Sequence, residues 1–202
     1  MSISYPYLPQ GRTVIYVNGD NPFMKVAKEV CREHSTDRQH PTGAVLVRND
    51  EILLKAANQS AIKNPTLLNL HKKGLCVRQI LKIPSGQKYW LCLGCGSSKN
   101  HAETLVVTEA ARKNIDTAGA DLYLWGHWWC CEPCWNAMIS AGIRGVYLLE
   151  GSERLFNRNY PDNIIGRQFE VWQGIATVIY YYKVRIFAKK IQRHQYVNEK
   201  QR

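Results

Sequence analysis

Apolar residues recur at two different spacings along the first third of the chain. In segment 23–33 they recur every three or four residues, which predicts a helix with one buried face. Segments 43–47 and 52–57 are instead short runs rich in residues that favour strands, separated by Arg48-Asn49-Asp50-Glu51. This pattern predicts two strands joined as a hairpin.

The middle of the chain continues to alternate between helices and strands. Segment 101–113 has the Ala, Leu and Glu content of a helix, and segment 121–125 has the apolar run of a strand. Segment 134–141 predicts a helix that ends at Gly142, and segment 145–149 predicts the next strand. The order of helix, two strands, helix, strand, helix and strand is typical of an α/β domain.

The remaining segments suggest one main domain with two flanking regions. We expect an N-terminal extension over 1–21 and an α/β domain over 22–165, with a long loop at 64–100. Segment 166–202 is basic, and we expect it to pack on the domain or in an oligomer interface. Within it, 168–192 fits one long helix or a shorter strand, and both interpretations stay open.

The composition narrows the class of protein. No run of about 18 apolar residues predicts a membrane span, and the N-terminus has neither the basic start nor the apolar stretch of a secretion signal. The seven cysteines are an odd number and include two Cys-x-x-Cys pairs, which favours reduced thiols and metal binding over a disulfide framework. We therefore expect a cytoplasmic protein that does not bind membranes.

The formal net charge of +11 indicates an anionic partner, although a solvated basic surface has the same composition. Much of the excess lies in segment 183–202, where seven basic residues are opposed only by Glu199. Four tyrosines nearby would allow stacking on nucleic-acid bases. We nevertheless favour a nucleotide over nucleic acid as the partner.

Two short clusters carry the candidate chemistry. His101 and Glu103 form one, and Cys131 and Cys134 form the other. An imidazole and two thiolates are three ligands for a tetrahedral zinc ion and leave its fourth position open, as in catalytic sites. If each cluster lies in the first turn of a helix, both helix N-termini can converge on one metal, with Glu103 beside it as a proton carrier.

This pattern of His101-Ala102-Glu103 followed by Cys131-Glu132-Pro133-Cys134 resembles the cytidine deaminase superfamily. The resemblance covers about residues 22–150. The segment ahead of the first motif is similar to that of the deoxycytidylate deaminases of bacteria and archaea, on these residues: Cys76-Val77-Arg78, Ile83-Pro84-Ser85-Gly86, Tyr89 and Cys92. Gly43-Ala44-Val45 also lies where the first strand of that family begins.

The resemblance implies a three-layer α/β/α fold with a mixed sheet, and a zinc ion bound by His101, Cys131 and Cys134. It implies that a zinc-bound hydroxide attacks C4 of cytosine, that Glu103 shuttles the protons, and that Asn58 contacts the nucleotide. The expected reaction is hydrolytic deamination of a deoxycytidine nucleotide, dCMP to dUMP, in a homo-oligomer.

The sequence also departs from the family. Cys130 stands where a proline usually precedes the first cysteine ligand. A shifted register through Glu132-Pro133-Cys134, like that of tRNA adenosine deaminases, would need a cysteine at position 137, which is Ala137. Two alternatives stay open: a deaminase of cytosine or adenine in single-stranded nucleic acid or tRNA, and a non-catalytic zinc protein on the same fold.

Further residues near the motifs have candidate roles. Arg78 could bind a 5′-phosphate through its guanidinium fork, and Trp128 and Trp129 could stack on a pyrimidine ring. A second, structural zinc ion could be held within the long loop, with core or free thiols as the alternative, by His71, Cys76, Cys92 and Cys95.

Overall fold

The computed structural model describes residues 6–37, 40–72, 75–83, 88, 91–92, 97–165 and 167. These residues all belong to one compact unit that runs from Met1 to Gln168. The basic segment 166–202, with its ambiguous stretch 168–192, lies outside the described residues except for Arg167. Among the helices that the structure describes, none combines the length and the hydropathy needed to cross a membrane.

A mixed sheet of five strands forms the centre of the unit. Its strands are β1 (Val14–Val17), β2 (Gly43–Arg48), β3 (Glu51–Ala57), β4 (Asp121–Trp125) and β5 (Gly145–Leu149). The order across the sheet is β1-β5-β4-β2-β3, with β1, β5 and β4 parallel and with β4, β2 and β3 antiparallel. The sequence predicts four of these strands to within one residue at each end.

Strand β1 lies in the expected N-terminal extension and is absent from the sequence prediction. It pairs with β5 from Val14 opposite Val146 to Val17 opposite Leu149. The strand has only four residues, and its two central side chains are exposed. Such a short edge strand lacks the apolar alternation by which a half-buried strand is identified.

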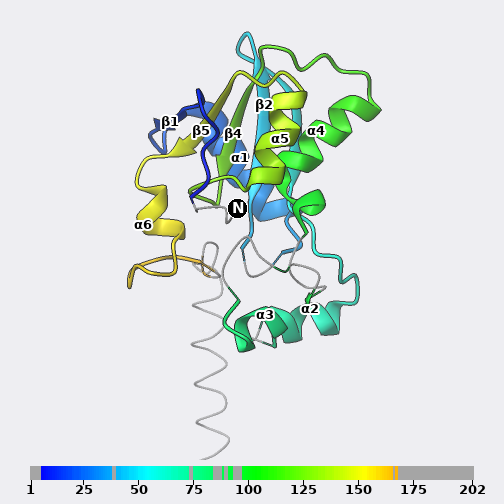
Figure 1. Ribbon diagram of the computed structural model, residues 1–202, viewed down its shortest axis with the longest axis vertical. Helices are drawn as coiled ribbons and strands as arrows, with labels where there is room; N and C mark the ends of the chain where they lie inside the picture. Colours follow the sequence, from blue (N-terminus) through cyan, green and yellow to red (C-terminus); the bar gives the residue numbers. More distant parts are fainter. Residues whose placement is uncertain are drawn as a thin grey trace, which may run out of the picture. The chain divides into compact units, whose positions relative to one another are not determined.

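Helices cover both faces of the sheet (Figure 1). Helix α1 (Pro22–His34) packs on one face, where the ring of Phe23 lies 5.1 Å from that of Tyr123 in β4. Helices α4 (Ala102–Arg112) and α5 (Glu132–Ser140) pack on the other face. Because side chains alternate along a strand, Leu122 and Leu124 point to this second face and join the main core there. The expected three-layer α/β/α arrangement is confirmed.

Two local features set the geometry of the first layer. Asn49 and Asp50, with φ of 50° and 62°, form the turn between β2 and β3, as expected for a two-residue hairpin. Gly43 begins β2 directly under α1, where an added Cβ would lie 2.2 Å from the carbonyl oxygen of Ala27 and 2.6 Å from the amide nitrogen of Cys31. A glycine is therefore required for this close approach.

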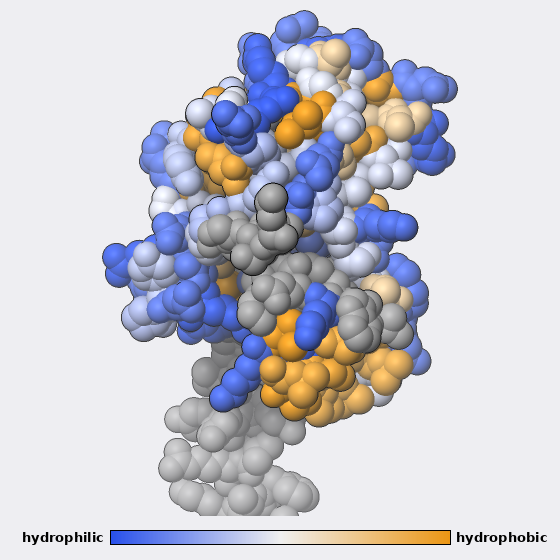
Figure 2. Space-filling model, in the orientation of Figure 1, coloured by the Kyte–Doolittle hydropathy of each residue, from blue (hydrophilic) through white to orange (hydrophobic). Residues whose placement is uncertain are grey.

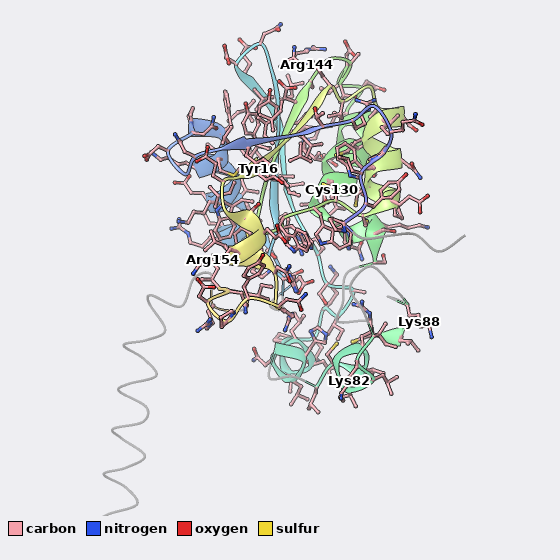
Figure 3. All side chains as sticks on the ribbon, turned by 60° about the vertical axis from the view of Figure 1, so that its left-hand side comes forward. Tyr16, Lys82, Lys88, Cys130, Arg144 and Arg154 are labelled. Atoms are coloured by element: carbon pink, nitrogen blue, oxygen red, sulfur yellow. The ribbon has the colours of Figure 1, made fainter. Side chains whose placement is uncertain are left out.

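The segment expected as a long loop at 64–100 contains helices. These are α2 (Pro65–Lys72), α3 (Val77–Ile80) and the 3₁₀ helix η2 (Ser98–Asn100). Its apolar side chains gather on the surface (Figure 2), and the exposed ones are Leu67, Leu70, Leu75, Val77, Ile80 and Leu81. Lys82 and Lys88 extend from the same part of the chain in Figure 3. Because these apolar side chains are exposed, the segment has no apolar core of its own among its described residues.

The chain after β5 returns toward the end of the sheet. Helix α6 (Ser152–Phe156) places the ring of Phe156 5.0 Å from Trp125, edge to face. Phe156 is fully buried, and Arg158 follows it two residues later. Because Phe156 packs against Trp125 at the end of β4, Arg158 lies near the residues that follow β4.

Candidate metal centre

The two motifs lie at the N-termini of neighbouring helices. His101 is the N-cap of α4, and its carbonyl oxygen accepts a hydrogen bond from the amide of Leu105. Cys131 is the N-cap of α5, and Cys134 lies in the first turn of that helix. Because α4 and α5 lie side by side on one face of the sheet (Figure 1), both N-terminal ends face one point. The positive ends of the helix dipoles favour thiolate and carboxylate groups there.

The three expected zinc ligands lie together. His101 Nδ1 is 3.5 Å from Cys131 Sγ and 3.4 Å from Cys134 Sγ, and the two sulfurs are 3.2 Å apart. A tetrahedral zinc ion with Zn–S of about 2.3 Å and Zn–N of about 2.1 Å places its ligand atoms roughly 3.6–3.8 Å apart. The two nitrogen–sulfur distances are within about 0.2 Å of that spacing, and the two sulfurs would move apart by roughly 0.6 Å to bind the ion, so the three residues fit a zinc ion.

The protonation of Cys131 also favours a metal ion. The pKa of the Cys131 thiol is held well below its usual value by hydrogen bonds, first from Cys134 and then from His101. A thiolate is the form of cysteine that binds zinc. The hydroxyl oxygen of Thr104 lies 3.4 Å from Cys134 Sγ and can donate to that sulfur. Hydrogen bonds of this kind fix the orientation of a metal ligand.

Glu103 lies beside this cluster in the first turn of α4. Its side chain is only 5 % exposed, and burial raises its pKa above the ordinary value, while the neighbouring charge of His101 opposes the increase. The thiol of Cys130 donates a hydrogen bond to the Glu103 carboxylate. In Figure 3, Cys130 lies between the sheet and helices α4 and α5. Raising the pKa of a buried carboxyl group makes it better able to hold a proton that it accepts and to deliver that proton again.

A cluster of basic side chains lies next to the same point. Burial lowers the pKa of His40 well below its usual value. Four neighbouring basic groups lower it further: His127, Arg158, Arg78 and His101. The rings of His40 and His127 are 5.8 Å apart. These side chains surround His40 from several elements, which is an arrangement suited to an anion.

His40 itself has an unusual hydrogen-bonding state. Its Nε2 accepts a hydrogen bond of 3.3 Å from Arg158 Nε, so the neutral ring carries its hydrogen on Nδ1. That Nδ1 is buried and has no partner among the described residues. A ligand oxygen at this place would satisfy a buried donor that is otherwise costly.

Asn58 lies at the end of β3 and holds the chain around His40 in place. Its Oδ1 accepts hydrogen bonds from Ser35 Oγ at 2.6 Å and from the Thr42 amide at 2.9 Å. Its Nδ2 donates to the carbonyl oxygen of His40 at 2.7 Å. One Nδ2 hydrogen remains without a partner among the described residues, so the expected nucleotide contact of Asn58 stays a prediction.

The tryptophans predicted to stack on a base differ in burial. Trp129 is 7 % exposed and belongs to the core beneath α4 and α5, whereas Trp128 is half-buried and packs against that core. Their rings are 6.2 Å apart and nearly perpendicular. His127 accepts hydrogen bonds through Nδ1 from the amides of both residues. Hydrogen bonds to His127 therefore hold Trp128 and Trp129 in place, and stacking of these tryptophans on a base stays a prediction.

The predicted second metal group is partly described. The ligand atoms of His71, Cys76 and Cys92 lie within 4.8 Å of one another, and all three residues are buried. Cys95, the fourth member of the predicted group, lies outside the described residues. Arg78, two residues after Cys76, is buried close to His40, as its effect on the pKa of His40 requires.

Sequence reasoning missed His40 and Arg158. His40 lies between α1 and β2, 61 residues from His101, and Arg158 lies beyond the last predicted strand. Neither residue belongs to a motif, and only the folded chain brings them together. The one signal available from sequence was the net positive charge.

Comparisons with known proteins give one matching family model and several similar solved structures. Residues 17–150 match the family model described as the cytidine and deoxycytidylate deaminase zinc-binding region. A search of curated proteins found no match.

Among solved structures, the chain is similar to the dCMP deaminase of cyanophage S-TIM5 in its apo form, at 21 % identity and a TM-score of 0.39 over 62 % of this chain and 78 % of that one. The same enzyme in complex with dCMP and dUMP gives 19 % identity and a TM-score of 0.40, over 65 % and 82 % of the two chains.

A third similar structure is the diaminohydroxyphosphoribosylaminopyrimidine deaminase/5-amino-6-(5-phosphoribosylamino)uracil reductase of Thermotoga maritima. It is 21 % identical with a TM-score of 0.37, over 62 % of this chain and 28 % of that one. Since the family model matches more than half of the 202 residues, the chain belongs to the family with the cytidine and deoxycytidylate deaminase zinc-binding region.

Proposed function

We propose that the protein catalyses the hydrolytic deamination of a deoxycytidine nucleotide, dCMP to dUMP, with zinc bound by His101, Cys131 and Cys134. The observation that carries the proposal is the placement of buried Glu103 next to three ligand atoms that lie 3.2–3.5 Å apart. When bound by these residues, zinc would act as a Lewis acid and would lower the pKa of a bound water to about 7.

Glu103 carries the protons in this reaction. Its carboxylate takes one proton from the attacking water and delivers it to N3 of the cytosine ring. It then takes the remaining proton from the new C4 hydroxyl and delivers it to the amino group, so that the C4–N bond breaks and ammonia leaves as C4=O forms. Burial raises the pKa of Glu103, which supports this role because the same group must give back the proton that it takes.

The phosphate of the substrate binds, in this proposal, at the basic cluster around His40. Arg158 and Arg78 supply charge, and the Nδ1–H of His40, which has no partner within the described part of the chain, donates to a phosphate oxygen. Guanidinium groups bind phosphate through paired, charge-assisted hydrogen bonds. Asn58 keeps His40 in position through its carbonyl oxygen and offers its second Nδ2 hydrogen to the sugar.

The direct test is ammonia release from a panel of cytosine and adenine nucleosides, nucleotides and short single strands. We expect turnover of dCMP, with deoxycytidine much poorer because it lacks the phosphate. Turnover of single strands in preference to dCMP would replace the proposal with a nucleic-acid deaminase. Absence of ammonia from every substrate, with zinc bound, would indicate a non-catalytic zinc protein.

A further inference from the structure

We propose that His71, Cys76 and Cys92 bind a second, structural zinc ion that holds the segment at 64–100 together. Their ligand atoms lie within 4.8 Å of one another, and no part of this group belongs to the site that contains His101. Cys95 lies outside the described residues, so the proposal rests on the other three.

The donor set selects zinc among the common metal ions. Two thiolates and an imidazole suit Zn²⁺, whereas Mg²⁺ and Ca²⁺ prefer oxygen ligands. His71 lies at the end of α2, Cys76 immediately precedes α3, and Cys92 follows later in the chain. A single ion would therefore connect three separate parts of the segment, which is the role of a structural zinc site.

The burial pattern of the segment gives a second, independent argument. Among its described residues, the buried ones are His71, Cys76, Arg78 and Cys92, and its leucines and isoleucines are half-buried or exposed. A segment without an apolar core gains too little from burial to fix its fold, and small folds of this kind commonly depend on a metal ion. The buried residues here are the metal ligands and one arginine.

Asp37 supplies the environment that a histidine ligand needs. It is 7 % exposed and lies near the His71 side chain. Carboxylates next to metal-bound histidines commonly orient the ring and increase its basicity.

The proposed ion also has a consequence for the basic cluster. Cys76 directly precedes α3, and Arg78 on that helix lies near His40. Binding of Cys76 by the ion would fix the start of α3 and with it the position of Arg78. Loss of this ion should therefore weaken phosphate binding without removing the ligands of the first zinc.

The test is the zinc content of the full-length protein, purified after growth in zinc-supplemented medium. We expect two zinc ions per chain in the wild type, and one in Cys76→Ala and in Cys92→Ala. Cys31→Ala removes a buried thiol outside both groups and is the matched control, with two zinc ions expected.

Cys131→Ala tests the same proposal by removing a ligand of the first zinc ion, and it leaves the sequence of segment 64–100 unchanged. If the proposal is right, this variant keeps one zinc ion, and its cobalt-substituted form shows the near-ultraviolet band of thiolate-to-cobalt charge transfer. A wild type with one zinc ion and a Cys131→Ala variant with none would overturn the second site. That result would leave the proposed deamination intact, because the first site would still hold its metal.

Discussion

The carboxylate of Glu103 accepts a hydrogen bond from the thiol of Cys130. Both side chains are buried, and Cys130 directly precedes the ligand Cys131. The donor stabilises the charged form of Glu103 against the burial that opposes it. The chain thus has a polar contact to the proposed proton carrier at the position where the family usually has proline.

Cys130→Ala should slow catalysis while leaving the metal in place. Because a hydrogen bond to a charged group is worth about 1.5–3 kcal/mol and a thiol is a weak donor, we expect kcat for dCMP to fall roughly threefold to tenfold. Zinc content should equal that of the wild type. Cys31→Ala is the control for loss of a buried thiol, and an unchanged kcat in Cys130→Ala would show that the contact has no catalytic effect.

Arg158→Gln should separate binding of the phosphate from the chemical step. Arg158 Nε donates a hydrogen bond to His40 Nε2 at the edge of the candidate metal centre. Loss of a charge-assisted contact of about 1.5 kcal/mol or more predicts a KM for dCMP at least about tenfold higher. The comparison is deoxycytidine, whose kcat/KM should not change. An equal loss for both substrates would place the arginine outside a phosphate site.

Gly43→Ala should destabilise the fold because β2 runs directly under α1. The new methyl group would lie 2.2 Å from the backbone oxygen of Ala27, and neither backbone can move without separating the helix from the sheet. Overpacking of this kind costs about 1–3 kcal/mol. Thermal unfolding measures the effect, with Gly19→Ala as control, since its nearest neighbour would be 3.9 Å away. Equal melting temperatures for the two variants would contradict the close approach.

His127 should make the fold sensitive to acid. Burial lowers its pKa to about 3, whereas an unfolded histidine titrates near 6.5. Between these values the unfolded chain binds a proton that the folded chain does not, so stability falls as pH decreases through this window, by at most about 1.4 kcal/mol per pH unit.

His127→Asn is the matched variant for this effect, because Asn Oδ1 can accept the two amide hydrogen bonds of His127 Nδ1 and does not titrate. Urea unfolding of both proteins between pH 7.5 and 5 measures the difference in their loss of stability. Protonation of the metal ligands affects both proteins equally, so it cancels in this difference. The wild type should lose more stability than the variant. Parallel pH profiles would mean that His127 is not held neutral by the fold.

The sequence predicted those parts of the fold and site that local pattern determines. Helix α1, the β2–β3 hairpin and strands β4 and β5 follow from the hydrophobic period and the turn residues, and the structure confirms them. The sequence also predicted the approach of His101 to Cys131 and Cys134, because residues at the N-termini of consecutive helices on one sheet face can converge, and the structure shows that they do.

The parts that the sequence did not predict depend on contacts between distant segments. Strand β1 is defined by its pairing with β5, and its own four residues have no diagnostic pattern. The place of Arg158 depends on Phe156 packing against Trp125. The helices of segment 64–100 expose most of their apolar residues, so the periodicity that identifies a buried helix face is missing.

The most direct test of the account is ammonia release from dCMP by zinc-loaded wild type and by Glu103→Gln with the same zinc content. Glutamine keeps the shape of the side chain but carries no proton between atoms of the substrate. We expect the wild type to turn over dCMP and the variant to lose at least about 100-fold in kcat. Equal rates for the two proteins, or no turnover by the zinc-loaded wild type, would contradict the proposed reaction.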